Sequence, residues 1–201
     1  MVSLAEARSS QLALQDQGTR LLETFKISDI VGELGEFGLQ GSLTYGLMIK
    51  PDIDARVYCN EPDINKVAEI AATIMTLPNV IRTQVLNYNS YPSGPGQPQG
   101  IYLGIKYDFE DVLWNFDSWI INPANELGAE FNDLGTIDSD VKDTILLLKY
   151  RLRELGLYPG SSKIAGSFSS ADLYRAIVRD DARDIDQLIE WRQQHPVMNK
   201  S

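Results

Sequence analysis

The stretch GLQGSLTYGLMIKPDIDARVYC, residues 38–59, decides the fold of this chain. In its second half Asp52 and Asp54 alternate with apolar residues, and Arg56 continues their polar face. This period of two predicts a half-buried β-strand. The two aspartates then point their carboxylates the same way, with Cα atoms about 6.5–7 Å apart. Because neighbouring carboxylates repel each other, we expect positive charge between them.

This acid pair could bracket divalent cations. Two-metal phosphoryl-transfer sites hold their ions about 3.5–4 Å apart, and carboxylate oxygens are the hard ligands that Mg²⁺ prefers. A third carboxylate from a neighbouring strand would complete such a site. Asp117 is the best candidate, because it points away from the apolar face that Trp114 and Phe116 form on its own strand. Asp117 could instead face solvent or pair with Arg56.

A glycine–serine pair precedes the acids. Gly41 lets the backbone approach a phosphate closely, and Ser42 with the amides after it offers donors at the start of a short helix. Gly46 then allows a tight return into the aspartate strand. Lys106, on the polar face of a later predicted strand, could reach a triphosphate or be an ordinary surface lysine.

The order of these motifs resembles the nucleotidyltransferase superfamily that includes DNA polymerase beta. The matching residues are Gly41-Ser42, Gly46, Asp52-Ile53-Asp54 and Asp117 within WNFDSWII. Within the superfamily the chain looks most like bacterial stand-alone nucleotidyltransferases, including those that adenylylate aminoglycosides and lincosamides. The likeness covers residues 37–121, and Pro51 departs from it, because many members have serine there. The resemblance implies an α+β fold, a mixed β-sheet flanked by helices with a C-terminal helical part.

The resemblance also implies an activity and a set of roles. Asp52, Asp54 and Asp117 would bind two Mg²⁺ ions, and Asp117 is also a candidate to accept the proton of the acceptor hydroxyl. Gly41, Ser42 and Lys106 would bind a nucleoside triphosphate such as ATP. The expected reaction moves a nucleoside monophosphate to a hydroxyl of a small-molecule acceptor and releases pyrophosphate.

Other interpretations stay open at this point. The chain could be a catalytically silent nucleotide-binding or protein-interaction module, like one half of a toxin–antitoxin pair, although such a module has little need for three repelling acids. The same chemistry could act on a protein hydroxyl or an RNA end. Tyr45 and Tyr102 could stack on a base, although aromatic packing explains them equally well.

Composition narrows the class of protein. The 201 residues include 28 acidic and 18 basic side chains, for a formal net charge of -10, which disfavours a long nucleic-acid acceptor. With one cysteine, Cys59, and one histidine, His195, a zinc site or cysteine–histidine catalysis is a poor explanation. No run approaches the roughly 20 apolar residues of a membrane span, and no signal-peptide pattern opens the chain. We expect a cytoplasmic, bacterial protein.

Periodicity and turn residues predict the remaining elements. Helices are expected over 4–25, with a possible break at Gly18, over 61–77, over 137–156, and twice more within 167–195. Strands are expected over 37–40, 52–59, 79–88, 101–109 and 112–121, with a tight turn at Glu110-Asp111 and a mobile hairpin loop at 90–100. The composition shifts near 125–137, where strand patterns give way to helical ones. This shift predicts a catalytic domain over 1–125 and a helical C-terminal domain over 126–201.

Overall fold

The structure is a computed structural model that describes residues 2–91, 98–126, 134–159 and 166–196. The chain divides into two compact units. The sheet unit is Leu14–Ala129, and the helical unit joins Met1–Ala13 to Glu130–Ser201. The domain assignment made from the sequence stays a prediction. The predicted loop at 90–100 falls mostly on residues 92–97, which lie outside the described residues.

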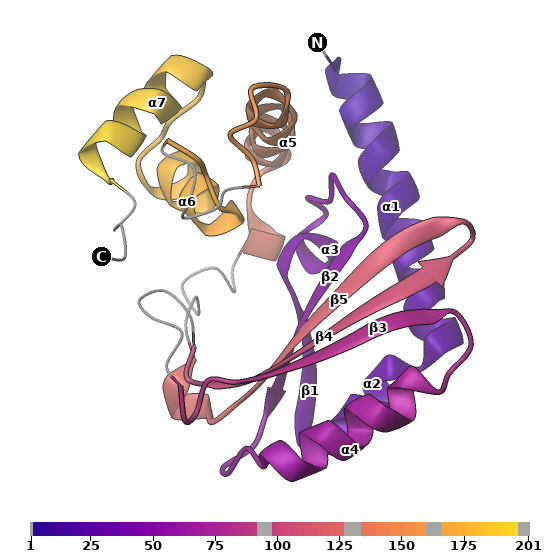
Figure 1. The fold of residues 1–201 in the computed structure, drawn as a ribbon. Coiled ribbons are helices and arrows are strands. Elements are labelled where there is room, and N and C mark those ends of the chain that lie inside the picture. Colours follow the sequence, from indigo (N-terminus) through magenta and orange to yellow (C-terminus); the bar gives the residue numbers. More distant parts are fainter. Residues whose placement is uncertain (1, 92–97, 127–133, 160–165, 197–201) are drawn as a thin grey trace. The chain divides into compact units, whose positions relative to one another are not determined.

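A five-stranded mixed sheet forms the centre of the sheet unit, with strand order β1-β2-β5-β4-β3 (Figure 1). The strands are β1 Glu36–Gln40, β2 Asp52–Tyr58, β3 Val80–Asn87, β4 Gly100–Phe109 and β5 Val112–Ile121. The β2–β5 pair is parallel, and the other pairs are antiparallel. All five predicted strands are confirmed, and with the flanking helices they give the expected α+β fold.

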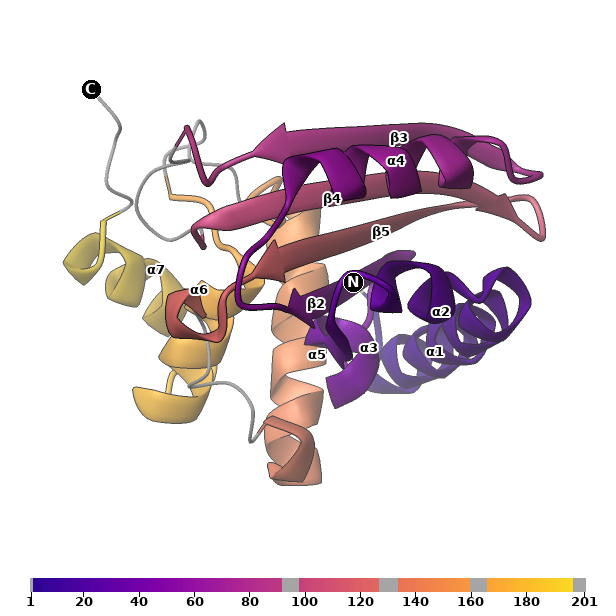
Figure 2. The same cartoon turned by 90° about the horizontal axis from the view of Figure 1, so that it is seen from below.

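The helices of this unit follow from local sequence. They are α2 Ile27–Gly32, α3 Gly41–Tyr45, α4 Ile64–Met75, the later part of α1 Leu4–Phe25, and a 3₁₀ turn at Pro123–Asn125. The Asp63 carboxylate accepts the Asn65 N–H and caps α4. Helix α4 packs along β3 and β4 (Figure 2). The sequence did not predict α2, whose apolar residues Ile27 and Val31 are fully buried.

One face of the sheet supplies the core. Ile53, Ala55 and Val57 of β2 are each 0% exposed. They join one apolar cluster with residues of α1 and α4, including Leu21, Phe25, Val67, Ala71 and Ile74. The polar partners in the β2 alternation therefore lie on the opposite face of the sheet.

Helix α1 is continuous, so the break considered at Gly18 is wrong. An added Cβ at Gly18 would lie 3.1 Å from Trp114 Cη2 and 3.3 Å from Leu43 Cδ1. Trp114 is fully buried. Glycine in a helix costs about 1 kcal/mol relative to alanine, and here it lets α1 approach the indole ring closely.

The β4–β5 hairpin turns where the sequence predicted. Glu110 and Asp111 both take positive φ angles, 53° and 60°, as a two-residue hairpin turn of type I′ requires. The Arg20 guanidinium of α1 pairs with the Glu110 carboxylate at 2.8 Å. This surface ion pair ties the turn to the helix.

The helical unit contains α5 Ser139–Glu154, α6 Ser170–Tyr174, a π-helical turn Arg175–Arg179 and α7 Ile185–Gln194. Asp138, Ser169 and Asp184 each accept a backbone N–H at the start of a helix, as capping residues do. The first turns of α1 belong to this unit, where Arg8 pairs with Asp143. None of the described helices has the length and apolarity that crossing a membrane requires.

Candidate active site

The parallel pairing of β2 with β5 brings the three predicted acids together. The register sets Asp54 directly opposite Asp117, and Asp52 shares the same face of β2. Carboxylate oxygens of Asp52, Asp54 and Asp117 all lie within 4.8 Å of one another. Residues more than sixty positions apart in the sequence thus form one cluster, which we call the acid cluster.

The acid cluster is electrostatically strained. Burial, followed by the charges of Asp52 and Asp117, raises the pKa of Asp54 from 3.8 to about 7. Burial likewise raises the pKa of Asp117, against a hydrogen bond that lowers it. The Lys50 ammonium lies 2.5 Å from the Asp52 carboxylate and supplies part of the expected positive charge. Further positive charge here would stabilise the ionised cluster.

The donor set of this cluster fits a divalent cation such as Mg²⁺. It offers carboxylate oxygens, the hard ligands that Mg²⁺ prefers. Gly41 faces the cluster with a φ of +76°, and a Cβ there would lie 2.4 Å from Asp54 Oδ2. A larger residue at position 41 would be strained by its backbone conformation and would push into the carboxylate. The space beside Asp54 therefore depends on glycine.

The turn before β2 has the shape that the sequence predicted. Helix α3 begins at Gly41, and Gly46 ends it with a φ of 70° while its N–H donates to the Ser42 carbonyl. The next residues, Leu47 and Met48, are fully buried and anchor the return into β2. Ser42 lies in the first turn of α3, half-buried. Phosphate binding by this turn stays a prediction.

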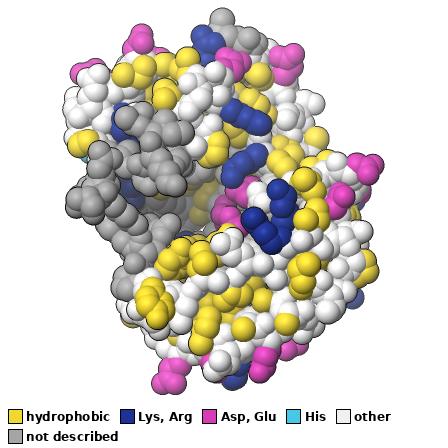
Figure 3. All heavy atoms as spheres, viewed as in Figure 1, with side chains coloured by type: hydrophobic (Ala, Val, Ile, Leu, Met, Phe, Trp, Pro, Cys, Tyr) yellow, Lys and Arg dark blue, Asp and Glu magenta, His cyan; other side chains and the backbone are white. Residues whose placement is uncertain are grey.

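Basic residues share the face of the acids. Lys106 of β4 lies opposite Asn115 of β5, which lies opposite Asp52. Arg82 of β3 lies opposite Lys106 in the β3–β4 register. The charge of Arg82 lowers the pKa of Asp117. Figure 3 shows basic side chains grouped beside acidic ones near the middle of the view. The nucleotide-binding role assigned to Lys106 stays a prediction.

The sequence missed the partner of Asp117. The Tyr102 hydroxyl donates to Asp117 Oδ1 at 2.6 Å. The sequence left open a pairing of Asp117 with Arg56. Among the interactions described for Asp117, the partner is Tyr102 instead. Alternation already put Tyr102 on the polar face of its strand, but the β4–β5 register was needed to place it beside Asp117.

Arg56 lies on the same face of β2, beside Asp54. Burial lowers its pKa, and the charge of Asp54 acts in the opposite direction. Arg56 Nε has no hydrogen-bond partner among the described residues. Next to it, the Tyr58 hydroxyl donates to Glu126 at 2.6 Å and accepts from Gln40 Nε2 at 3.1 Å. This network holds the end of β2 against β1.

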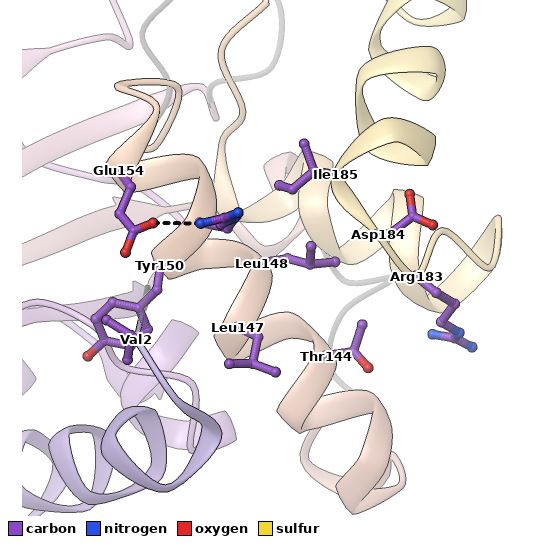
Figure 4. Close-up of a pocket in the computed structure, with 10 residues that line it drawn as sticks. Val2, Thr144, Leu147, Leu148, Tyr150, Glu154, Arg183, Asp184 and Ile185 are labelled. Carbon is purple, nitrogen blue, oxygen red and sulfur yellow. Dashed lines mark hydrogen bonds and ion pairs between the residues drawn. The ribbon is translucent and has the colours of Figure 1, made fainter.

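The helical unit has a pocket of its own, about 330 Å³ in volume, along α5 and the start of α7 (Figure 4). Leu147, Leu148 and Ile185 give it an apolar wall. Arg151 and Glu154, paired at 3.1 Å, also line the pocket. No sequence motif pointed to this pocket.

No protein-family model and no curated protein matches the chain. Solved structures do. The non-canonical poly(A) polymerase complex GLD-2–GLD-3 has a TM-score of 0.60 at 14% identity, over 100% of this chain and 66% of that chain. The Cid1 poly(U) polymerase with Mg and 3′-dATP bound has a TM-score of 0.55 at 16% identity, over 81% of this chain and 49% of that one.

A cytoplasmic RNA terminal U-transferase is similar as well, with a TM-score of 0.55 at 14% identity, over 87% of this chain and 53% of that chain. The chain thus spans about half to two-thirds of the length of these structures. The similarity shows that it has the nucleotidyltransferase fold. The closer resemblance to bacterial aminoglycoside-type enzymes stays a prediction.

Proposed function

We propose that this protein is a Mg²⁺-dependent nucleotidyltransferase that moves a nucleoside monophosphate from a nucleoside triphosphate to an acceptor hydroxyl. The observation that carries the proposal is the acid cluster, with oxygens of Asp52, Asp54 and Asp117 within 4.8 Å beside Gly41. Burial, together with repulsion from Asp52 and Asp117, raises the pKa of Asp54 to about 7. A module that only binds a partner gains nothing from such an arrangement, whereas a cation-dependent enzyme needs it.

Each residue has a defined part in this reaction. Asp52, Asp54 and Asp117 would hold Mg²⁺, which when bound neutralises triphosphate charge and lowers the pKa of the acceptor hydroxyl. Gly41 and Ser42 would bring backbone amides close to the phosphates. Lys106 lies on the same sheet face as the acids and would bind the triphosphate as well.

The bonding changes follow from these positions. The acceptor oxygen attacks the α-phosphorus in line, a new O–P bond forms, and the bond to the leaving pyrophosphate breaks. Asp117 would accept the acceptor's proton, which leaves the acceptor oxygen free to attack. Positioning and charge neutralisation account for most of the expected acceleration.

The acceptor could belong to one of two classes. The formal net charge of -10 favours a small molecule over a long anionic polymer. The structural neighbours are poly(A) and poly(U) polymerases and an RNA terminal U-transferase, which favours an RNA end. A basic side-chain row on the acid face, Arg82 and Lys106, could meet an acceptor phosphate in either class.

A labelling experiment tests the proposal. Purified protein is incubated with Mg²⁺, each nucleoside triphosphate, and a panel of RNA oligonucleotides, nucleosides, metabolites and aminoglycosides. Mass spectrometry detects the added nucleotide, and a coupled assay follows pyrophosphate. We expect transfer to at least one acceptor and none with Asp54→Asn. Tight binding of Mg–ATP without turnover on any acceptor would instead favour the silent module.

A further inference from the structure

The sheet face that carries the acids also carries aromatic side chains whose rings have no role in the proposed reaction. Tyr102 of β4 and Trp119 of β5 lie opposite each other, two positions along the ladder from the Gly104–Asp117 pair and therefore on the same face. Tyr88 follows the end of β3. All three aromatic side chains are half-buried. They lie outside the apolar core, on the polar side of the sheet.

These rings form a continuous series. Tyr88 and Trp119 stack with centroids 5.4 Å apart and an interplanar angle of 22°. Tyr102 meets Trp119 edge-on, with centroids 5.4 Å apart at 61°. The Tyr102 hydroxyl reaches Asp117 at 2.6 Å. The series therefore begins at a carboxylate of the acid cluster and leads away from it across β5 toward β3.

A glycine makes room for the first ring. Gly104 lies within β4, where glycine weakens a strand because it has no side chain to pack. A Cβ at this position would lie 2.5 Å from the Tyr102 hydroxyl oxygen and 2.9 Å from its ring carbons. The ring of Tyr102 thus occupies the space that a side chain at position 104 would fill. This placement aims the hydroxyl at Asp117.

We propose that Tyr102, Trp119 and Tyr88 form a stacking surface for a planar heteroaromatic ring of the acceptor, which places the acceptor hydroxyl next to Asp117. This inference rests on the proposed nucleotidyl transfer. Aromatic side chains stack on bases whatever the base sequence, because every base has a π-face. Arg82 and Lys106 of the same face add positive charge for an anionic group. The acceptor is therefore a nucleobase-bearing compound, either an RNA end or a free nucleoside.

Equilibrium binding tests the stacking surface without any need for turnover. The probes are adenosine, a short oligoadenylate and ribose, titrated into the full chain in the presence of Mg²⁺. We expect Trp119→Leu to weaken binding of adenosine and oligoadenylate about 5- to 150-fold, the usual loss per stacked base. Trp119→Phe keeps a ring and should retain most of the affinity. Mg–ATP binding serves as the control that neither variant changes.

Tyr102 provides a second pair of variants. Tyr102→Phe keeps the ring and should bind both base-bearing probes as the wild type does, whereas Tyr102→Leu should bind them more weakly. Circular dichroism checks that each variant is folded. Ribose, which has no planar ring, should bind more weakly than adenosine and show no difference between Trp119→Leu and the wild type.

The outcomes distinguish an RNA end from a free nucleoside as the compound that carries the ring. They also distinguish failure of the stacking surface from failure of the proposed function. Oligoadenylate binding more tightly than adenosine identifies an RNA end, and equal binding identifies a free nucleoside. Unchanged affinity in folded Trp119→Leu, or no binding of either base-bearing probe, overturns the stacking surface. Absence of pyrophosphate release with every acceptor would count against the proposed function but not against base binding at this surface, because the binding measurement does not require turnover.

Discussion

The two faces of the central sheet differ although the same strands build them. Toward α1 and α4, β2 presents Ile53, Ala55 and Val57, each 0% exposed. On the other face the alternate residues, Asp52 and Asp54, join Asp117 in a cluster of acids. Burial stabilises the first face, whereas desolvation and repulsion destabilise the second. We infer that stability and chemistry are assigned to opposite sides of one strand.

We expect the largest effect from a substitution on the acid face, and the property that it changes is activity. Asp54→Asn removes one proposed Mg²⁺ ligand and its charge, and we expect transfer to fall about 1000-fold or more, because such electrostatic stabilisation is worth several kcal/mol. Steady-state pyrophosphate release measures the loss. Glu69→Gln makes the same chemical change on the exposed side of α4 and should leave activity unchanged. A folded Asp54→Asn protein with wild-type activity would remove the basis of the proposed function.

Substitution on the apolar face should instead cost stability. Ile53→Ala leaves a cavity in the core and should lower the free energy of unfolding by about 2–5 kcal/mol. Ile81→Ala changes the same side chain where it is 50% exposed, and we expect a loss below about 1 kcal/mol. Urea denaturation at fixed temperature compares the two. Equal losses would mean that the faces do not differ in the way described.

The acid face should also make stability depend on pH. The native pKa of Asp54 is raised from 3.8 to about 7, so its contribution to stability is full below pH 3.8 and is lost as the pH rises through about 7. Without divalent metal, the free energy of unfolding should fall by an amount on the order of 4 kcal/mol across this range.

Asp54→Asn supplies the control for this pH dependence, because the amide cannot ionise. Thermal unfolding in EDTA at pH 5 and pH 8 should show a larger drop for the wild type than for Asp54→Asn. Adding Mg²⁺ should raise the unfolding temperature of the wild type, more at pH 8 than at pH 5. The same slope in both proteins would show that Asp54 ionises normally in the fold.

The smallest expected effect comes from the hydroxyl that holds Asp117. Tyr102→Phe removes the hydrogen bond to Asp117 Oδ1, and we expect about a 10-fold lower kcat, as for other residues that orient a ligand. That hydrogen bond lowers the pKa of Asp117, so its loss should move the acidic limb of the kcat profile to higher pH. A profile that keeps both its height and its position would leave Tyr102 with a packing role alone.

Much of the molecule could be predicted from local pattern. Alternation over 52–59 and 112–121 assigned side chains to faces, and turn residues such as Glu110-Asp111 marked where strands end. Two predictions failed where packing overrides local preference. Gly18 continues α1 because Trp114 needs close approach, and the short helix α2 forms because Ile27 and Val31 are buried, not because its sequence strongly favours helix.

The sequence alone determined which residues share a face, because alternation along a strand is a local property of the backbone. It also singled out Asp52, Asp54 and Asp117, since acids in apolar strands require a reason. Only the tertiary structure decided that β5 lies parallel beside β2 with Asp54 opposite Asp117, and that Tyr102 reaches the same carboxylate. Strand order and register depend on contacts between residues far apart in the chain, and a shift of one residue would turn the acids into the core.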